Sequence, residues 1–191
     1  SSEKFPLKED LNTDKPLSFY AATKKCNEVM AFSYSNIFNL PTTGLRFFTV
    51  YGEMGRPDMS LFKFTENMVK GKPIELFNNG DHVRDFTYIS DVVNPLKKLI
   101  FLPSKKKIPY DIFNIGSQNP KTLTYFLKII SNKLKIKPII KKKSLQMGDV
   151  YKTHASIKKL KIKLNFSPKT NLKEGVHNFI DWYIKDKTKI K

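Results

Sequence analysis

Residues 17–52, LSFYAATKKCNEVMAFSYSNIFNLPTTGLRFFTVYG, join a long helical pattern to a compact apolar run. The first part has the 3.6-residue periodicity of a helix, and Ser18 stands where a helix N-cap is expected. Asn39 and Pro41 end this pattern. Residues 42–52 are typical of a buried strand, because they are mostly apolar and close with a glycine. We therefore expect a helix followed directly by a strand of the parallel-sheet kind.

The same alternation of helices and strands continues to the end of the chain. Short apolar runs predict strands over residues 73–77, 110–116 and 137–142. Helical periodicity predicts helices over residues 59–70, 91–102, 123–134 and 171–187. Strands that alternate with helices indicate an α/β fold with parallel strands.

The length and composition of the chain restrict its class. It has 191 residues, 40% of them hydrophobic, which is enough for a buried core in one domain or one and a half. No apolar stretch approaches the roughly 18 residues of a membrane span. The single cysteine, Cys26, excludes an internal disulfide and fits a reducing cytoplasm. The chain begins with Ser1 instead of methionine, and residues 1–10 have no strand pattern, so we interpret it as a fragment.

The net charge of +18 raises the question of a nucleic-acid partner. Only three of the 35 basic residues are arginines, and the lysines are spread through the chain. The densest lysine runs, residues 133–143 and 158–163, alternate with isoleucine and leucine. That spacing is typical of half-buried strands or amphipathic helices with solvated lysine faces. We therefore predict no nucleic-acid partner and no membrane partner.

Tyr20 and Lys24 stand four residues apart in the first helix, so their side chains are expected on one face of it. A tyrosine is a weak base at neutral pH, and a neighbouring ammonium group favours its phenolate form. Such a pair can remove a proton from a sugar hydroxyl while a nicotinamide accepts the hydride. The spacing alone is not specific, because Tyr183 and Lys187 repeat it near the end of the chain.

Three ordered motifs make the pattern specific. They are residues 16–30, PLSFYAATKKCNEVM, residues 41–65, PTTGLRFFTVYGEMGRPDMSLFKFT, and residues 84–93, RDFTYISDVV. Together they resemble the NAD-dependent epimerase/dehydratase family of extended short-chain dehydrogenases/reductases, and within it they are most similar to the UDP-glucuronate 4-epimerases. The resemblance runs nearly end to end, through the loop QMGDV at residues 146–150 and the closing helix.

The resemblance implies an α/β fold that combines the C-terminal part of a Rossmann-like, doubly wound parallel sheet with a small α/β substrate-binding lobe. Residues 1–52 would supply the C-terminal portion of the dinucleotide-binding domain. Residues 53–191 would form mainly the nucleotide-sugar-binding lobe, with residues 86–116 returning to the Rossmann-like sheet. The cofactor would be NAD and the substrate a UDP-sugar. The full-length protein would be a cytoplasmic homodimer joined through the helix of Tyr20.

The resemblance also assigns roles to particular residues. Tyr20 matches the catalytic base, and Lys24 matches the lysine that assists it and holds the nicotinamide ribose. Tyr51, at the carboxyl end of its strand, falls where the family binds the cofactor. Four residues match substrate-binding positions: Thr49 at the sugar, Arg56 at the uronate carboxylate, Arg84 at the diphosphate and Asp149 near the uridine ribose. The guanidinium group of an arginine suits a carboxylate because its parallel N–H donors match a planar anion.

Other residues are interpreted as structural. Arg46 lies within the predicted buried strand, where a structural role is favoured over a ligand role. Cys26 is expected to be a small core residue of the first helix. The three histidines share no metal-ligand spacing, so no metal site is predicted.

The chain departs from the family pattern at several points. Glu53 and Met54 stand where the family usually has Pro-Trp, and Ser90 stands where it has a second acidic residue. The first change lies close to Arg56 and therefore bears on substrate preference. The glycine-rich G-x-x-G-x-x-G turn, which seats a pyrophosphate at a helix N-terminus, does not occur in the sequence. The Ser or Thr partner of the catalytic tyrosine is also not found.

Three functions stay open on the sequence alone. The leading one is 4-epimerisation of UDP-glucuronate to UDP-galacturonate through a 4-keto intermediate, with Tyr20 taking the O4 proton. A nucleotide-sugar 4,6-dehydratase shares the first oxidation, but its further acid and base residues would lie upstream of Ser1. A non-catalytic fragment or basic binding module would keep the fold without the chemistry. The fragment alone is expected to be inactive.

Overall fold

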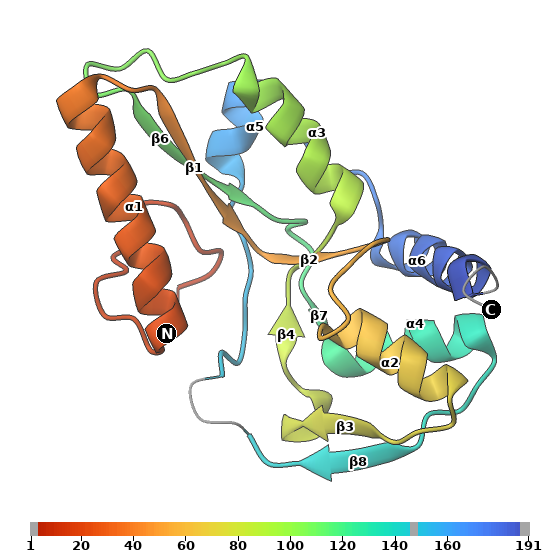
Figure 1. Cartoon of the computed structure of the whole chain (residues 1–191). Helices are drawn as coiled ribbons and strands as arrows, with labels where there is room; N and C mark the ends of the chain where they lie inside the picture. The colour runs from red at the N-terminus through yellow and green to blue at the C-terminus, as the bar shows by residue number, and fades with distance from the viewer. Residues whose placement is uncertain (1–3, 146–148, 188–191) are drawn as a thin grey trace.

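The computed structural model describes residues 4–145 and 149–187, and its helices and strands alternate as the sequence predicts (Figure 1). Within the described residues the helices are α1 (Phe19–Phe38), α2 (Ser60–Val69), α3 (Ile89–Ile100), α4 (Leu123–Leu134), α5 (Lys158–Leu164) and α6 (Leu172–Lys187), with a 3-10 turn η1 (Asn78–Gly80). The strands are β1 (Thr42–Phe47), β2 (Thr49–Tyr51), β3 (Ile74–Phe77), β4 (Val83–Arg84), β5 (Phe86–Tyr88), β6 (Tyr110–Ile115), β7 (Lys121–Thr122) and β8 (Ile140–Lys143). The α/β class is confirmed.

The ends of α1 lie where the sequence predicts them. The Oγ of Ser18 accepts a hydrogen bond from the backbone N–H of Ala21 at 3.2 Å, as an N-cap does. Asn39 adopts the left-handed conformation, with a φ of 50°, and ends the helix. Both boundaries are therefore set by local chemistry.

The apolar run 42–52 forms two strands where one is expected. β1 pairs in parallel with β6, whereas β2 pairs in parallel with β5. The change of partner occurs at Phe48, whose N–H donates to the carbonyl of Ile115 at 3.0 Å, while the N–H of Thr49 donates to the carbonyl of Asp85 at 3.1 Å. The expectation of a single strand is wrong, because the run leaves one neighbouring strand and joins another.

The strand pairing is mainly parallel, as expected. β3 pairs with β8 in parallel, and β4 pairs with β7 in an antiparallel ladder. Among the strands of the described residues, three pairings are thus parallel and one is antiparallel. The antiparallel pair joins the segment that carries Arg84 to the segment just before α4.

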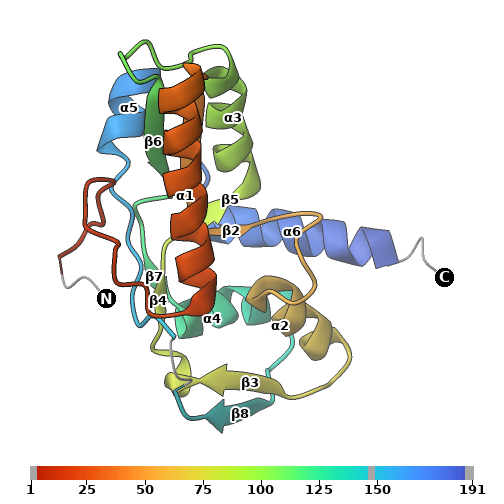
Figure 2. The same cartoon turned by 60° about the vertical axis from the view of Figure 1, so that its left-hand side comes forward.

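The elements form two parts that meet at β2 and β5 (Figure 1). In the first, which we call the sheet part, α1 lies against one side of the β1–β6 pair, and α5 and α3 lie on the other (Figure 2). In the second, which we call the lobe, α2 and α4 lie over the β3–β8 pair, and α6 packs along α4. The ends of β2 and β5 thus come between the two parts.

Each part has its own apolar core. The lobe core is built around Phe126, Phe179 and Ile180, and the ring of Phe126 stacks on that of Phe86 with 4.3 Å between centroids. Trp182 packs against this core, 5.5 Å from the ring of Phe179. The core of the sheet part is smaller, and its buried members include Val92, Leu99, Phe113, Ile115, Ile157 and Leu160.

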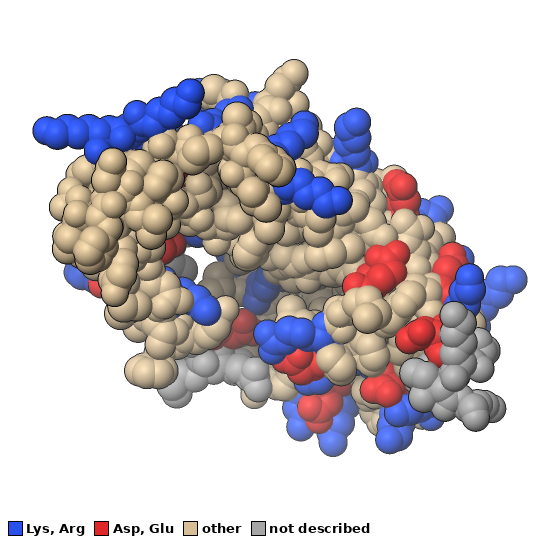
Figure 3. All heavy atoms as spheres, turned by 45° about the horizontal axis from the view of Figure 1, so that its top comes forward, with Lys and Arg blue, Asp and Glu red and all other residues tan. Residues whose placement is uncertain are grey.

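The helix α1 buries little of its apolar surface against this chain. Ser35 is its one buried residue, and the helix lies wholly within the described residues. Its exposed large apolar side chains are Phe19, Tyr20, Val29, Met30, Phe32, Tyr34, Ile37 and Phe38. Figure 3 shows this side of the molecule as a broad surface with few charges. Cys26 is also exposed, so its assignment to the core is wrong: it faces a side of α1 that the described chain leaves uncovered.

The two lysine runs adopt different structures. Residues 158–163 belong to α5, in which Leu160 and Leu164 are buried, so this run is an amphipathic helix. The earlier run enters β8, which within the described part of the chain pairs only with β3 and exposes most of its side chains. No helix within the described residues has both the length and the apolar content to cross a bilayer.

Candidate active site

Tyr20 and Lys24 lie in the first two turns of α1 and share one face of it, as the sequence predicts. The Nζ of Lys24 is 5.3 Å from the centroid of the Tyr20 ring. Tyr20 is 71% exposed. The pair is therefore accessible to a ligand, with an ammonium group beside the phenol.

A small pocket opens at the carboxyl end of β2. It is lined by residues of β2, of the loop 52–59 and of the start of α2, together with the core rings of Phe86, Phe126 and Phe179. Thr49, Tyr51 and Arg56 all line it. The structure thus brings three of the predicted site residues to one place.

The side chain of Tyr51 belongs to the lobe core. Its ring lies 5.6 Å from that of Tyr88 and 6.1 Å from that of Phe126. Burial raises the pKa of the Tyr51 phenol well above its ordinary value. A Cβ on Gly175 would meet the Tyr51 hydroxyl at 2.3 Å, which shows how closely α6 packs there. Contact between Tyr51 and a cofactor therefore stays a prediction. Because the side chain is packed in the core, such a contact would have to be made by the backbone of Tyr51.

The loop 52–59 is fixed at its start by Glu53, one of the departures from the family pattern. The Tyr88 hydroxyl donates to the Glu53 carboxylate at 2.7 Å. Burial and this hydrogen bond raise the pKa of Tyr88 to about 12. Gly52 has a φ of 146°, and a Cβ there would lie 2.5 Å from Cγ2 of Ile89. Nothing local in the sequence links residue 53 to residue 88, so this anchor was not predicted.

Arg56 lies further along the same loop and pairs with Asp58. The Nε of Arg56 donates to Oδ1 of Asp58 at 2.9 Å, and its Nη2 donates to Oδ2. The side chains are 76% and 55% exposed. The hydrogen bond to Asp58 and the negative charge of Asp58 raise the pKa of Arg56. The charge of Arg56 is therefore paired within the loop, by Asp58.

Arg84 and Asp149 meet although 65 residues separate them. The Nη2 of Arg84 donates to Oδ1 of Asp149 at 3.0 Å, and its Nη1 donates to the carbonyl of Tyr151 at 3.1 Å. Burial lowers the pKa of Arg84, against the raising effect of Asp149. The Nε2 of His82, a residue given no role in the sequence interpretation, lies 3.3 Å from Oδ2 of Asp149. Residues 146–148 of the predicted loop lie outside the described residues.

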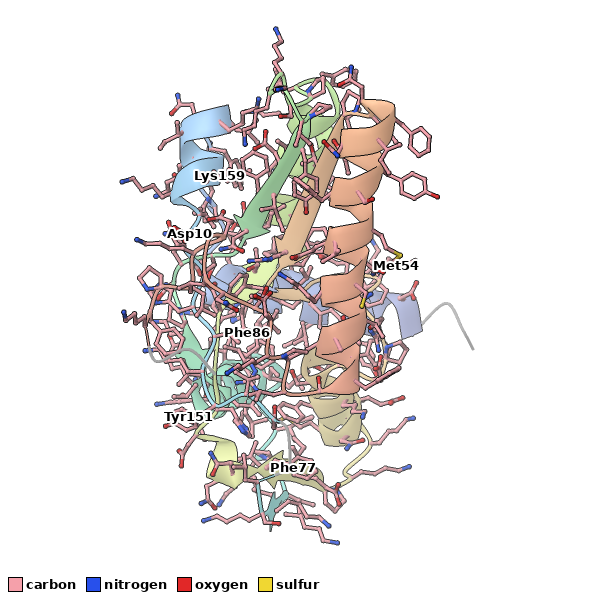
Figure 4. The ribbon with its side chains drawn as sticks, turned by 90° about the vertical axis from the view of Figure 1, so that its left-hand side faces the viewer. Asp10, Met54, Phe77, Phe86, Tyr151 and Lys159 are labelled. Carbon is pink, nitrogen blue, oxygen red and sulfur yellow. The ribbon has the colours of Figure 1, made fainter. Side chains whose placement is uncertain are left out.

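The Arg84–Asp149 pair and the loop 52–59 are separate places on the molecule. Figure 4 separates Tyr151, which adjoins the first, from Met54, which belongs to the second, with Phe86 at a level between them. Thr49 and Arg56 therefore belong to one group of predicted site residues, and Arg84 and Asp149 to another. Tyr20 and Lys24 lie on α1, and neither of them lines the pocket.

Asp85, beside Arg84, is a buried carboxylate that holds the region together. Its Oδ1 accepts from the N–H and the hydroxyl of Ser117 at 2.8 and 2.6 Å. Its Oδ2 accepts from the N–H of Gln118 at 3.2 Å and from the N–H of Ala155 at 2.8 Å. Four donors from two distant segments thus fix the residue between β4 and β5. The motif RDFTYI contains this residue, but its partners are too distant in sequence to be foreseen.

Arg46 has the structural role predicted for it. Its Nε and Nη2 donate to the two carboxylate oxygens of Glu28 at 2.7 and 2.8 Å, and its Nη1 donates to the carbonyl of Glu9 at 3.1 Å. The fork of Arg46 thus ties β1 to α1 and to the N-terminal segment.

The comparison with protein families decides the classification. The family model described as "NAD dependent epimerase/dehydratase family" matches residues 1–116, which is more than half of the chain. The chain belongs to this family. The predicted cofactor, NAD, agrees with the description of the family.

Individual relatives within the epimerase/dehydratase family agree with the predicted subfamily. Protein CapI of Staphylococcus aureus is 44% identical over 94% of this chain and 58% of its own length. UDP-glucuronate 4-epimerase 1 of Arabidopsis thaliana is 41% identical over 96% of this chain and 46% of its own length. The chain thus spans about half the length of the curated relatives it matches.

Solved structures show the same likeness. The crystal structure of UDP-glucuronic acid 4-epimerase from Bacillus cereus, in complex with UDP-glucuronic acid and NAD, matches with a TM-score of 0.88 and 29% identity. The match covers 97% of this chain and 58% of that structure. A dTDP-glucose 4,6-dehydratase from Bacillus anthracis matches with a TM-score of 0.80 at 22% identity, which shows the shared fold only.

The residues of this epimerase/dehydratase chain fit one end of a dinucleotide. Lys24 offers an exposed ammonium donor beside Tyr20, a combination suited to a ribose hydroxyl and a reacting hydroxyl. Among the described residues no cluster of three or more His, Cys, Asp and Glu side chains could hold a metal ion. The residues that fit NAD, Tyr20 and Lys24, would contact its nicotinamide end.

Proposed function

We propose that this chain is the C-terminal part of an NAD-dependent UDP-glucuronate 4-epimerase. The observation that carries the proposal is the exposed Tyr20–Lys24 pair on α1, together with a pocket at the end of β2 that is lined by Thr49 and Arg56. Relatives and a solved structure with this function match nearly the whole chain. A base and a carboxylate-binding cation are what this substrate needs.

The proposed chemistry begins at Tyr20. In its phenolate form the Tyr20 side chain takes the proton of the O4 hydroxyl of the sugar, and it returns the proton after the sugar has turned. Lys24, whose Nζ lies 5.3 Å from the centroid of the Tyr20 ring, donates to the ribose next to it. NAD, when bound, accepts the hydride from C4 and returns it to the other face. Thr49 and Arg56 hold the sugar in the pocket.

The proposed UDP end of the substrate lies at Arg84 and Asp149. A guanidinium group stabilised in place by two hydrogen bonds is pre-ordered for the diphosphate. Asp149 accepts from a ribose hydroxyl once the substrate is bound. Because the two groups of residues are separate, a substrate that extends from nucleotide to sugar can span them.

We further propose that residues 1–52 complete a dinucleotide-binding domain and that residues 53–191 are mainly the substrate lobe, with residues 86–116 in the sheet. The exposed apolar side chains of α1 support a homodimer formed through this helix in the full-length protein, by which we mean this chain together with the N-terminal segment of its relatives. A cytoplasmic location agrees with the single free cysteine.

The proposed function is tested by turnover. The full-length protein is incubated with NAD and UDP-glucuronate, and the sugar anomeric signals are followed by NMR. Appearance of UDP-galacturonate is the expected result. Formation of a stable 4-keto-6-deoxy sugar from a neutral nucleotide sugar would instead indicate a dehydratase, and no change with any nucleotide sugar would indicate a binding module.

A further inference from the structure

The Arg56–Asp58 pair stands at the pocket to which the proposed function brings a carboxylate. Asp58 presents both of its oxygens to Nε and Nη2 of Arg56. Arg56 lines the pocket. The arginine assigned to the substrate carboxylate is therefore already engaged by a carboxylate of the chain.

A second carboxylate cannot use the same side of the guanidinium group. Nε and Nη2 form the fork that receives a planar anion through two parallel hydrogen bonds, and Asp58 fills it. An anion on the remaining N–H donors would lie close to the negative charge of Asp58. Bidentate binding of a uronate to the Nε–Nη2 edge of Arg56 thus requires that Asp58 leave.

The surroundings of Asp58 allow this exchange. Both partners are largely exposed, and such ion pairs contribute little to stability because water competes for each charge. Arg56 lowers the pKa of Asp58 chiefly through its hydrogen bond, and Lys63 lowers it further through its charge. Lys63 lies in the first turns of α2, so a cation is at hand for a displaced Asp58.

We propose that Asp58 competes with the substrate for Arg56: its carboxylate occupies the guanidinium group until the carboxylate of the sugar displaces it, and this competition lowers the affinity for the uronate selectively. This inference rests on the proposed function. A neutral sugar cannot displace Asp58, so the Arg56–Asp58 ion pair stays intact when such a sugar binds. The carboxylate of a uronate can replace that of Asp58, and Arg56 then forms its ion pair with the substrate.

The test compares Asp58→Asn with Asp58→Glu in the full-length protein loaded with NAD. Affinity for UDP-glucuronate and for UDP-glucose is measured by calorimetric titration, and KM and kcat are measured for UDP-glucuronate. Asp58→Asn should bind UDP-glucuronate about two- to fivefold more tightly, the scale of an exposed ion pair, with kcat little changed. Its affinity for UDP-glucose should change much less. Asp58→Glu keeps the carboxylate and should stay near the wild-type protein for both ligands.

The UDP-glucose measurement separates the inference from simpler explanations. An equal gain for both ligands would mean that the substitution only reduces repulsion of the diphosphate, and an equal loss would mean that Asp58 only shapes the loop. Either result overturns the inference and leaves the proposed function standing. Wild-type protein that neither binds nor converts UDP-glucuronate would remove the proposed function, and the inference with it.

Discussion

The helix α1 of the sheet part and the helices of the lobe bury their apolar side chains to different degrees. In the lobe, Phe126 and Ile130 of α4 and Val176 of α6 are completely buried. On α1, by contrast, Ser35 is the one buried residue. The difference teaches that the lobe core is nearly self-sufficient, whereas α1 has the composition of a buried helix without a cover in the described chain. The catalytic pair we propose lies on the side that lacks a cover.

The largest contrast is expected in ligand binding by the isolated 191-residue chain. Because the sequence lacks the glycine-rich turn, we expect no NAD binding at micromolar concentration and no epimerase activity. Weak binding of UDP at Arg84 and Asp149 should survive, since that region is held by the lobe. Calorimetric titration with each ligand separately checks this. Tight NAD binding would show that the sheet part is more complete than we conclude.

A second contrast concerns stability and uses one buried and one exposed side chain. Phe126→Ala should destabilise the isolated chain by about 3–5 kcal/mol, because it opens a cavity in the lobe core. Ile37→Ala on α1, where the side chain is 66% exposed, should change the free energy of unfolding by less than about 0.5 kcal/mol. Urea denaturation of both variants measures the difference. Equal losses would break the comparison between the two parts.

A third contrast concerns catalysis and uses the two tyrosines with a lysine four places on. In the full-length protein, Tyr20→Phe should lower turnover at least about a hundredfold with little effect on nucleotide-sugar binding, because it removes the proposed base. Tyr183→Phe is the matched control in the lobe, where the ring is buried and is retained by the substitution. The side chain of Lys187 lies outside the described residues. Similar losses of turnover in the two variants would refute the role of Tyr20.

The smallest of these contrasts concerns substrate choice. Arg56→Leu should weaken the binding of UDP-glucuronate by about tenfold or more, because the uronate loses the cation that pairs with it. The binding of UDP-glucose should change much less. Michaelis constants for UDP-glucuronate and affinities for both ligands provide the measurement. A uniform loss would point to a defect in the loop 52–59 instead of a lost carboxylate contact.

Local signals account for what the sequence could predict. The cap at Ser18, the left-handed Asn39 and the apolar strand runs are written in neighbouring residues, and the structure has them where they are expected. The four-residue spacing of Tyr20 and Lys24 is likewise a property of one helix. Membership of the epimerase/dehydratase family followed from ordered motifs and is confirmed.

Features that depend on distant partners could not be predicted. The run 42–52 divides because its first part pairs with β6 and its second part pairs with β5. The residues of the run themselves do not show where the change of partner occurs. Cys26 looks like a core residue by its helix position, but its burial depends on a cover that these residues do not supply. The contacts of Asp58 and of His82 with charged neighbours become visible only in three dimensions.

Asp85 has a consequence for the order in which the molecule is assembled. Its donors come from residues 32, 33 and 70 positions further along the chain. A buried carboxylate without them would be strongly disfavoured, so β4 and β5 cannot settle around it until residues 117, 118 and 155 have arrived. Closing such long loops is slow compared with forming a helix. The neighbouring Arg84 therefore reaches its place only after residue 155 has joined the fold.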